Sequence, residues 1–260
     1  MTATGEQTIP ASTPIAIGWR AVVHSLSRPY KVTIPMVVLV MLVPLYLVIA
    51  GMVRGRPVNV PAIALDNAFP LQPTWALIYG SLYAYLIVLP VLVVRQQDHI
   101  RRTVWAYLTV WIVAYVVFLM YPTVAPRPTN VEGDGFGAWG LRALYGADPP
   151  YNCFPSIHVA HSFVSALTCY RVHRHVGITA IVCAVLVALS TLYTKQHYVV
   201  DVIGGVLLAV AAYAVFLRNY PSDTIPEFER RLAPTLAVCV ISVITLGVAT
   251  FWFAYRTQIL

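Results

Sequence analysis

Residues 176–217 read VGITAIVCAVLVALSTLYT, KQH and YVVDVIGGVLLAVAAYAVFL in direct succession. The two outer runs are 19 and 20 residues long, and Asp201 is the single acidic residue in them. A helix of about 20 apolar residues is long enough to cross the hydrocarbon core of a bilayer. Only three residues separate the runs, which leaves room for no more than a tight turn. The stretch therefore predicts two neighbouring transmembrane helices joined by a polar turn.

The rest of the chain has the same character. Of its 260 residues, 59% are hydrophobic and 10% are charged, whereas a soluble domain has about 25% charged residues. Seven apolar segments are predicted to be transmembrane helices: Val32–Val53, Trp75–Val94, Thr103–Pro122, Ser156–Tyr170, Val176–Thr194, Tyr198–Leu217 and Pro234–Ala254. The fourth, at about 22 Å, crosses only if it starts below the membrane surface. The expected fold class is an all-α polytopic integral membrane protein with six core transmembrane helices and a C-terminal seventh.

The predicted domain organisation follows these helices. Residues 1–31 form a cytoplasmic N-terminal segment, in which Thr13 and Pro14 predict the start of an interfacial helix; a disordered tail is the alternative. This segment contains no continuous apolar stretch typical of a cleaved signal peptide. Residues 32–217 form the six-helix core. Residues 218–260 form a cytoplasmic loop and the extra C-terminal transmembrane helix.

The distribution of Lys and Arg predicts the orientation. Eleven of these residues lie on the N-terminal side of the predicted helices and six on the other side, so the N-terminus should be cytoplasmic. We expect a protein of the plasma or inner membrane. The net charge of +7 is explained by this topology, and no nucleic-acid partner is expected. The four cysteines contain no CxxC pair, which argues against a disulfide framework and a cysteine metal cluster.

Ionisable groups collect at three places on the outward side. The first is Arg127 between two prolines, and the second is the segment 153–162, where a loop enters the short fourth helix with Ser156 as N-cap and His158 behind it. The third is the turn 190–201, which contains Lys195, His197 and Asp201. Ionisable side chains near membrane depth are costly, which makes them functional candidates.

The spacing within the third group indicates its chemistry. His197 and Asp201 are four residues apart and share one face of a helix, so the carboxylate can orient the imidazole and leave its other nitrogen as a nucleophile. His158 and Ser156 come from a different helix. Together with Arg127 and Lys195 they supply the donors and positive charge that a phosphoryl group in transfer requires.

These residues resemble the type 2 phosphatidic acid phosphatase superfamily, whose pattern is KxxxxxxRP, then PSGH, then SRxxxxxHxxxD. The resemblance spans roughly residues 60–217 and implies an enzyme that needs no metal or other cofactor. It implies that His197 is the nucleophile, Asp201 its orienter, and His158 the general acid. Arg127 and Ser156 become phosphate ligands. The expected substrate-binding set is Arg127, Ser156, Lys195, Gln196 and Tyr198.

Two departures from the pattern point to a branch of this family. Met120 stands at the lysine of the first motif and Thr191 at the arginine of the third. A monoester carries nearly two negative charges at neutral pH and a diester one, so a site with fewer cations favours a diester. The variant PSxH, the segment 190–201, and Asp66 before the second span are similar to the inositolphosphorylceramide synthase and sphingomyelin synthase branch.

The resulting hypothesis is a lipid phosphotransferase. It would move a phospho-head group from a lipid phosphoester to a lipid or small alcohol acceptor through a phosphohistidine. A lipid phosphate or polyprenyl pyrophosphate phosphatase with the same site is the alternative, and a lipid transporter or assembly protein with a degenerate site is a third. The head group, the acceptor and the oligomeric state stay open.

Several residues have structural alternatives. His158 and His161, with His197 and Asp201, have the spacing of a zinc site. His161 is more typical of a packing residue. For Lys195, a helix-turn anchor at the membrane interface is the alternative to a binding role. The stretch 133–146 is either a flap over the site or an ordinary surface loop. The glycines Gly51, Gly55, Gly204 and Gly205 are predicted to be helix-packing positions.

Overall fold

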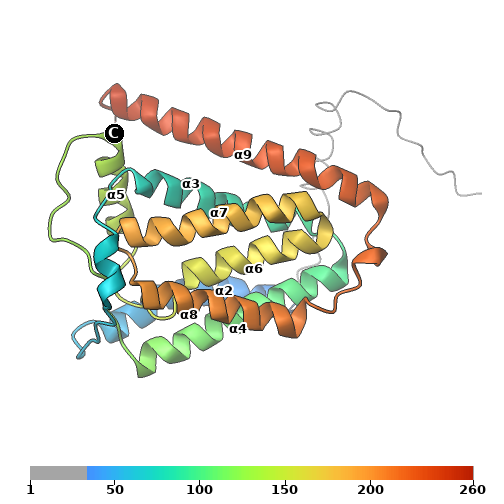
Figure 1. Ribbon diagram of the computed structural model, residues 1–260, viewed down its shortest axis with the longest axis horizontal. Helices are drawn as coiled ribbons and strands as arrows, with labels where there is room; N and C mark the ends of the chain where they lie inside the picture. Colours follow the sequence, from blue (N-terminus) through green and yellow to red (C-terminus); the bar gives the residue numbers. More distant parts are fainter. Residues whose placement is uncertain (1–33, 260) are drawn as a thin grey trace, which may run out of the picture.

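A computed structural model describes residues 34–259, and over these residues the protein is a helical bundle (Figure 1). The eight α-helices and two 3-10 helices of the described chain are α2 (Ile34–Val53), η1 (Ala64–Ala68), α3 (Trp75–Val93), α4 (Gln97–Met120), α5 (Phe136–Ala147), α6 (Ile157–Val172), α7 (Arg174–Tyr193), α8 (Val199–Phe216), η2 (Ser222–Thr224) and α9 (Glu227–Arg256). The predicted interfacial helix within residues 1–31 lies outside the described residues.

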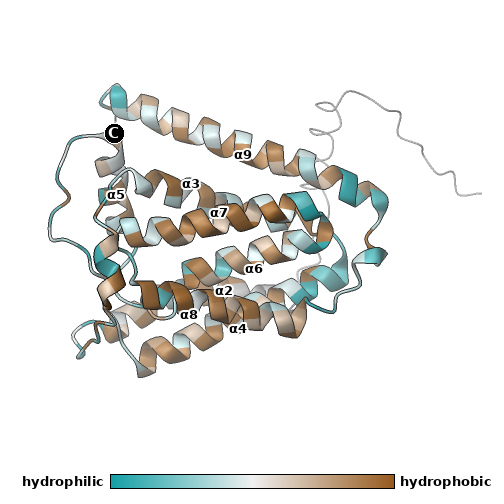
Figure 2. Ribbon diagram, viewed as in Figure 1, coloured by the Kyte–Doolittle hydropathy of each residue, from teal (hydrophilic) through white to brown (hydrophobic). Residues whose placement is uncertain are grey.

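The helices consist largely of hydrophobic residues, which are brown in Figure 2. Five of them are long and apolar enough to cross a membrane, namely α3, α4, α7, α8 and α9. All seven predicted apolar segments form helices in the described residues, which confirms the all-α polytopic membrane fold class, whereas the number of transmembrane helices stays a prediction. Helix α6 has 16 residues, or about 24 Å, and is therefore short for a full span.

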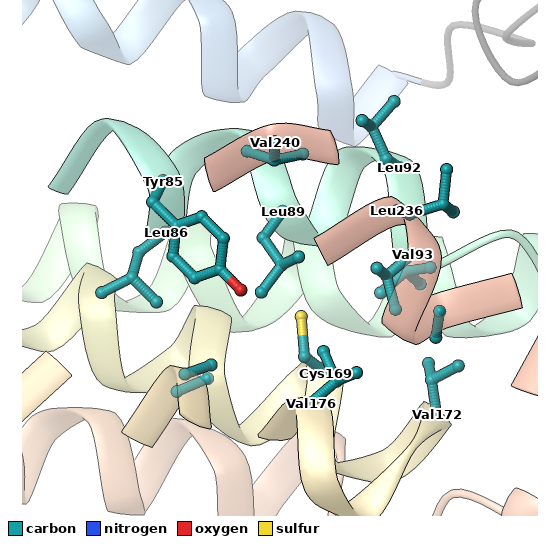
Figure 3. Packing of buried hydrophobic residues seen from close by; sticks show 14 of the residues in the cluster. Tyr85, Leu86, Leu89, Leu92, Val93, Cys169, Val172, Val176, Leu236 and Val240 are labelled. Atoms are coloured by element: carbon teal, nitrogen blue, oxygen red, sulfur yellow. The ribbon is translucent and has the colours of Figure 1, made fainter. Parts of the chain in front are cut away.

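Helix α6 occupies the middle of the bundle. It packs against α3, α4, α7 and α8, and its side chains belong to all three buried hydrophobic clusters of the described residues. The turn to α7 is tight, because a Cβ atom on Gly177 would lie 2.2 Å from the Tyr170 Cα atom. The first half of α9 completes the larger cluster, where Val240 lies near Leu89 of α3 and Leu236 lies near Leu92 and Val93 (Figure 3).

Helix boundaries differ from the prediction where polar residues extend a helix beyond its apolar part. Helix α4 begins at Gln97 and not at Thr103, and α9 begins at Glu227 and runs through Pro234. Hydropathy marks the part of a helix that lies in lipid, whereas its end is set by backbone capping.

The predicted glycine packing positions have different outcomes. Gly205 is a packing position, because a Cβ atom there would lie 2.6 Å from the Ser156 carbonyl oxygen. Gly204 is also closely packed, with the Phe154 ring 2.8 Å from such an atom. A Cβ atom on Gly51 or Gly55 would meet no atom of the described residues within 4 Å, so within this part of the chain the prediction was wrong for them.

One end of the bundle is covered by the long connections. The stretch 133–146 was predicted to be a flap or a loop, but most of it forms α5, which packs against the start of α3. The glycines in this stretch are poor helix formers, so the sequence did not indicate a helix. They also allow α5 to pack closely on α3, because a Cβ atom on Gly137 would lie 2.9 Å from the Thr74 Cα atom. Isolated bridges join Asn59 to Thr123 and Val124 to Tyr151. All three groups of candidate residues meet at this end.

Candidate active site

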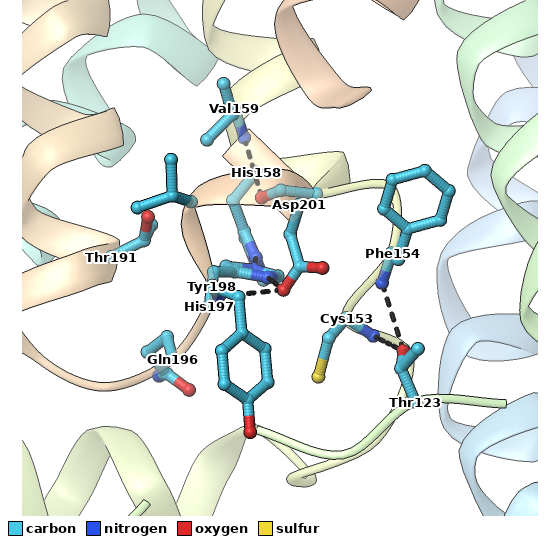
Figure 4. A network of polar contacts seen from close by, with 12 residues as sticks. Thr123, Cys153, Phe154, His158, Val159, Thr191, Gln196, His197, Tyr198 and Asp201 are labelled. Carbon is cyan, nitrogen blue, oxygen red and sulfur yellow. Dashed lines mark hydrogen bonds and ion pairs between the residues drawn. The ribbon is translucent and has the colours of Figure 1, made fainter. Parts of the chain in front are cut away.

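His197 and Asp201 lie at the start of α8. The Nδ1 atom of His197 is 3.3 Å from Asp201 Oδ2, and the same oxygen accepts a hydrogen bond of 2.9 Å from the Tyr198 amide (Figure 4). Asp201 is fully buried, and its Oδ1 atom has no hydrogen-bond partner among the described residues. The carboxylate thus caps the helix and holds the imidazole by one nitrogen, which leaves Nε2 available for chemistry.

A second carboxylate supports this turn from outside the helix. Asp66, in η1, accepts a hydrogen bond of 2.8 Å from the Val199 amide. An anion at a helix N-terminus satisfies an otherwise unpaired amide and interacts favourably with the helix dipole. Asp66 therefore fixes the position of α8, and with it His197, although the sequence assigned no task to this residue.

His158 approaches His197 from α6. Its Nδ1 atom lies 3.5 Å from His197 Nε2. Ser156 is the N-cap of α6, as predicted, and accepts a hydrogen bond from the Val159 amide. The Ser156 amide donates to the Asp201 carbonyl over 3.0 Å, which ties the start of α6 to the first turn of α8. This backbone contact aligns the two histidines.

Three tyrosine rings pack around His158. The rings of Tyr83 and Tyr79 from α3 lie 5.1 and 5.6 Å from the His158 ring between centroids, and Tyr46 from α2 lies at 6.4 Å. All three contacts are edge-to-face, the geometry that aromatic pairs prefer. His158 is thus oriented by a packed aromatic wall.

Arg127 lies beside the histidine pair, His158 and His197, and its guanidinium has several hydrogen-bond acceptors. Its guanidinium forms an ion pair of 3.2 Å with Asp148 and donates to the Asp148 carbonyl over 2.6 Å. It also donates to the side-chain oxygen of Gln196, the residue before His197. Its Cζ atom lies 4.7 Å from the centre of the Tyr145 ring, a cation–π contact. Arg127 is therefore held next to the histidine turn.

The other predicted binding residues differ in their placement. Gln196 and Tyr198 are buried in the turn between α7 and α8, and Gln196 reaches Arg127 as described. Lys195 is half-buried in a left-handed backbone conformation with φ of 53°, and its ammonium group has no hydrogen bond or ion pair with the described residues. The structure thus brings Gln196 and Arg127 together, but does not link Lys195 to them.

The two positions that depart from the family pattern do not supply positive charge. Met120 ends α4 and is 79% exposed. Thr191 is fully buried, and its hydroxyl donates to the Ala188 carbonyl over 2.7 Å. Its own carbonyl accepts from the amides of Gln196 and His197, so it shapes the turn.

The residues that could bind zinc together differ from those that the sequence suggested. Within the described residues, the ligand atoms that lie within 4.8 Å of one another belong to Cys153, His197 and Asp201. His161 is not in this group: its Nδ1 atom lies 3.4 Å from the Tyr83 hydroxyl, and its ring packs on Tyr107. Burial raises the pKa of the Cys153 thiol.

Sequence reasoning missed several residues at the site. Asp148 and Tyr145 hold Arg127, and Tyr46 donates a hydrogen bond of 2.9 Å to Asp148. The Tyr145 hydroxyl donates to the Thr194 carbonyl, and burial raises its pKa to about 12. The only sequence signal was the scarcity of acidic residues, ten in the chain, which makes each carboxylate in an outward connection a candidate.

Comparison with known proteins relates the chain to phosphatases. A PA-phosphatase related-family protein of Dictyostelium discoideum is 25% identical over 140 residues, which cover 49% of this chain and 25% of that protein. Sphingosine-1-phosphate phosphatase 2 of Mus musculus is 41% identical over 64 residues, 25% of this chain and 17% of that protein. The chain thus spans a quarter or less of the length of these curated relatives. No solved structure matches the chain significantly.

The sequence profile of the PAP2 superfamily matches residues 60–215. This range contains Arg127, Ser156, His158, His197 and Asp201, and it covers more than half of the chain. It leaves out α2 and α9. The protein belongs to the PAP2 superfamily.

Proposed function

We propose that the protein is a membrane enzyme that cleaves lipid phosphoesters by double displacement, without a metal, through a phosphohistidine on His197. The observation that carries this proposal is the line of Asp201, His197 and His158, with Nδ1 of His197 on the carboxylate and Nε2 facing the second imidazole. An oriented nucleophile with a second proton-transfer group beside it is the arrangement that covalent catalysis requires.

The reaction assigns one role to each group. Nε2 of His197 attacks phosphorus, the bond from phosphorus to the leaving oxygen breaks, and His158 gives this oxygen its proton. The neutral His158 then takes the proton of an incoming hydroxyl, whose oxygen attacks phosphorus and releases His197. Arg127 and Ser156 stabilise the phosphoryl oxygens. The facing nitrogens, His158 Nδ1 and His197 Nε2, are 3.5 Å apart, so the two side chains must turn apart by about 3 Å to admit a phosphoryl group between them.

Transfer of a head group between lipids is the favoured form of this reaction. Met120 is exposed, and the hydroxyl of Thr191 is bonded to the backbone. Among the positions of the three motifs, Arg127 and Lys195 therefore supply the positive charge near the histidines. A pocket with so little positive charge suits a monoanionic diester better than a dianionic monoester. The acceptor is then a lipid or small alcohol, and the site faces the outside of the plasma or inner membrane.

A phosphatase acting on lipid monoesters is the second candidate. The relatives favour it, because two of them are named sphingosine-1-phosphate phosphatase 2. In this reaction water replaces the acceptor hydroxyl, and all other roles are unchanged. The two candidates therefore differ in the substrate's charge and in the nature of the acceptor.

The deciding experiment incubates the purified protein with a phospholipid diester or a phosphatidate-like monoester, with and without an acceptor alcohol. We expect products of head-group transfer, identified by mass spectrometry, and a higher kcat/KM for the diester. A tenfold or greater preference for the monoester corresponds to about 1.4 kcal/mol of transition-state stabilisation and would replace the transferase with the phosphatase. Absence of any turnover on both substrates would contradict the enzyme assignment itself.

A further inference from the structure

Arg127, the cation of the proposed phosphate pocket, already has a carboxylate partner. Its NH2 atom lies 3.2 Å from Asp148 Oδ2, and its NH1 atom donates to the backbone carbonyl of the same residue over 2.6 Å. The Pro149 and Tyr145 carbonyls accept at 3.4 and 3.5 Å. One residue, Asp148, thus binds both ends of the guanidinium fork and supplies the negative charge in these contacts.

Asp148 is itself fixed in place. The hydroxyl of Tyr46, on α2, donates to Asp148 Oδ1 over 2.9 Å, so each carboxylate oxygen has a partner. The side chains of Arg127 and Asp148 are only 9% and 15% exposed. A pair this well buried is weakly screened by solvent, and its charges act strongly on any group that enters beside it.

We infer that Asp148 determines the charge selectivity of the site: by pairing with Arg127 it makes the phosphate pocket accept a singly charged phosphodiester in preference to a doubly charged monoester. This inference rests on the proposed function. Asp148 acts through Arg127 and touches no reacting atom, so it is a positioning residue and not a catalytic one.

The physical reason is the product of charges. A phosphoryl group bound to Arg127 also lies near the Asp148 carboxylate, because the two side chains are in contact. The repulsion by the carboxylate offsets part of the attraction by the cation, and this repulsion grows with the charge of the substrate. A dianion therefore loses more than a monoanion when Asp148 is ionised. Without this carboxylate, Arg127 would offer a full positive charge and the preference would shift toward the dianion.

The test is Asp148→Asn, measured as the ratio of kcat/KM for the monoester to kcat/KM for the diester. Asparagine can keep both contacts, with its oxygen facing Arg127 and its amide group facing the Tyr46 oxygen. We expect this ratio to rise about tenfold, mainly through a lower KM for the monoester. Asp148→Glu retains the charge and should keep the ratio of the unmodified protein.

Asp134→Asn is the matched control. Asp134 is exposed in the same connection between α4 and α6, and its contact within the described residues is made by its backbone carbonyl, which accepts from the Tyr255 hydroxyl. This variant loses the same charge without touching Arg127, so its ratio should not change. An equal rise in Asp134→Asn and Asp148→Asn would overturn the inference, because it would show a general effect of net charge. An unchanged ratio in an active Asp148→Asn protein would also overturn it.

A binding measurement covers the case in which Asp148→Asn loses turnover. Inorganic phosphate should raise the thermal unfolding temperature of Asp148→Asn more than that of the unmodified protein at equal concentration. An equal or smaller rise would overturn the inference. If the unmodified protein prefers the monoester, the transferase proposal fails, but the change of the ratio in Asp148→Asn still decides the role of Asp148.

Discussion

The imidazole of His197 lies between a carboxylate and a second imidazole, and this placement separates the roles of the two histidines. Asp201 contacts Nδ1 of His197, whereas His158 has no hydrogen bond or ion pair to a carboxylate among the described residues and packs against tyrosine rings. A histidine that is held by an anion is suited to carry a phosphoryl group. A histidine in an aromatic wall is suited to pass a proton in both directions.

Substitution of each histidine should therefore give a different result. His197→Ala should abolish turnover and the formation of labelled phosphohistidine for every substrate, because no covalent intermediate can form. The His158→Ala protein should cleave a lipid ester about 10²–10⁴-fold more slowly than the unmodified protein. Its loss of activity on a p-nitrophenyl ester should be much smaller, because a good leaving group needs no proton. Rapid quench with labelled substrate measures the intermediate. Equal losses on both ester types in His158→Ala would contradict the assignment of general acid.

Chelation distinguishes this mechanism from a metal site at Cys153, His197 and Asp201, whose ligand atoms are close enough for one ion. The proposed covalent mechanism predicts unchanged activity in chelator. Loss of activity that zinc restores would favour the metal site instead. Cys153→Ser, assayed in parallel, should remain active under the covalent mechanism.

At the scale of elements, the start of α6 and the first turns of α8 form one rigid unit. The Ser156 amide bonds to the Asp201 carbonyl, and the absence of a side chain at Gly205 lets α8 approach the Ser156 carbonyl oxygen this closely. Backbone atoms cannot move aside as a flexible side chain can. The distance between His158 and His197 thus depends on Gly205, a residue with no side-chain chemistry of its own.

Gly205→Ala should consequently harm both stability and activity. We expect a loss of about 1–3 kcal/mol in the free energy of unfolding, typical of overpacking, with lower kcat as α8 is pushed away from α6. Gly247→Ala in α9 is the control, because no atom of the described residues would lie within 4 Å of a Cβ atom there. It should leave activity unchanged and be neutral or stabilising by about 0.5–1 kcal/mol. Thermal unfolding in detergent and the lipid assay measure the two effects.

At the scale of the whole molecule, the bundle has two chemically different ends. One carries η1, α5 and the site, and the other carries the turn from α6 to α7 with His173 and Arg174. The count of Lys and Arg predicts that the site end faces outward. This orientation determines which leaflet supplies the substrate, and it stays a prediction.

Labelling of single cysteines tests the orientation. In a background without the four native cysteines, Asn130→Cys should react with an impermeant thiol reagent on intact cells. Arg174→Cys, which is also at an exposed position but at the opposite end, should react only after lysis. The reverse pattern would show that the site faces the cytoplasm.

The sequence alone determined the membrane fold class, the apolar helical segments, the N-cap at Ser156 and the spacing of His197 and Asp201. These features are local, because hydropathy and the helical period act over a few neighbouring residues. Only the tertiary structure decided that Asp148 pairs with Arg127, that Tyr46 holds Asp148 from 102 residues away, and that 136–147 is helical. Such contacts form between segments brought together by packing, and no local pattern in either segment specifies its partner.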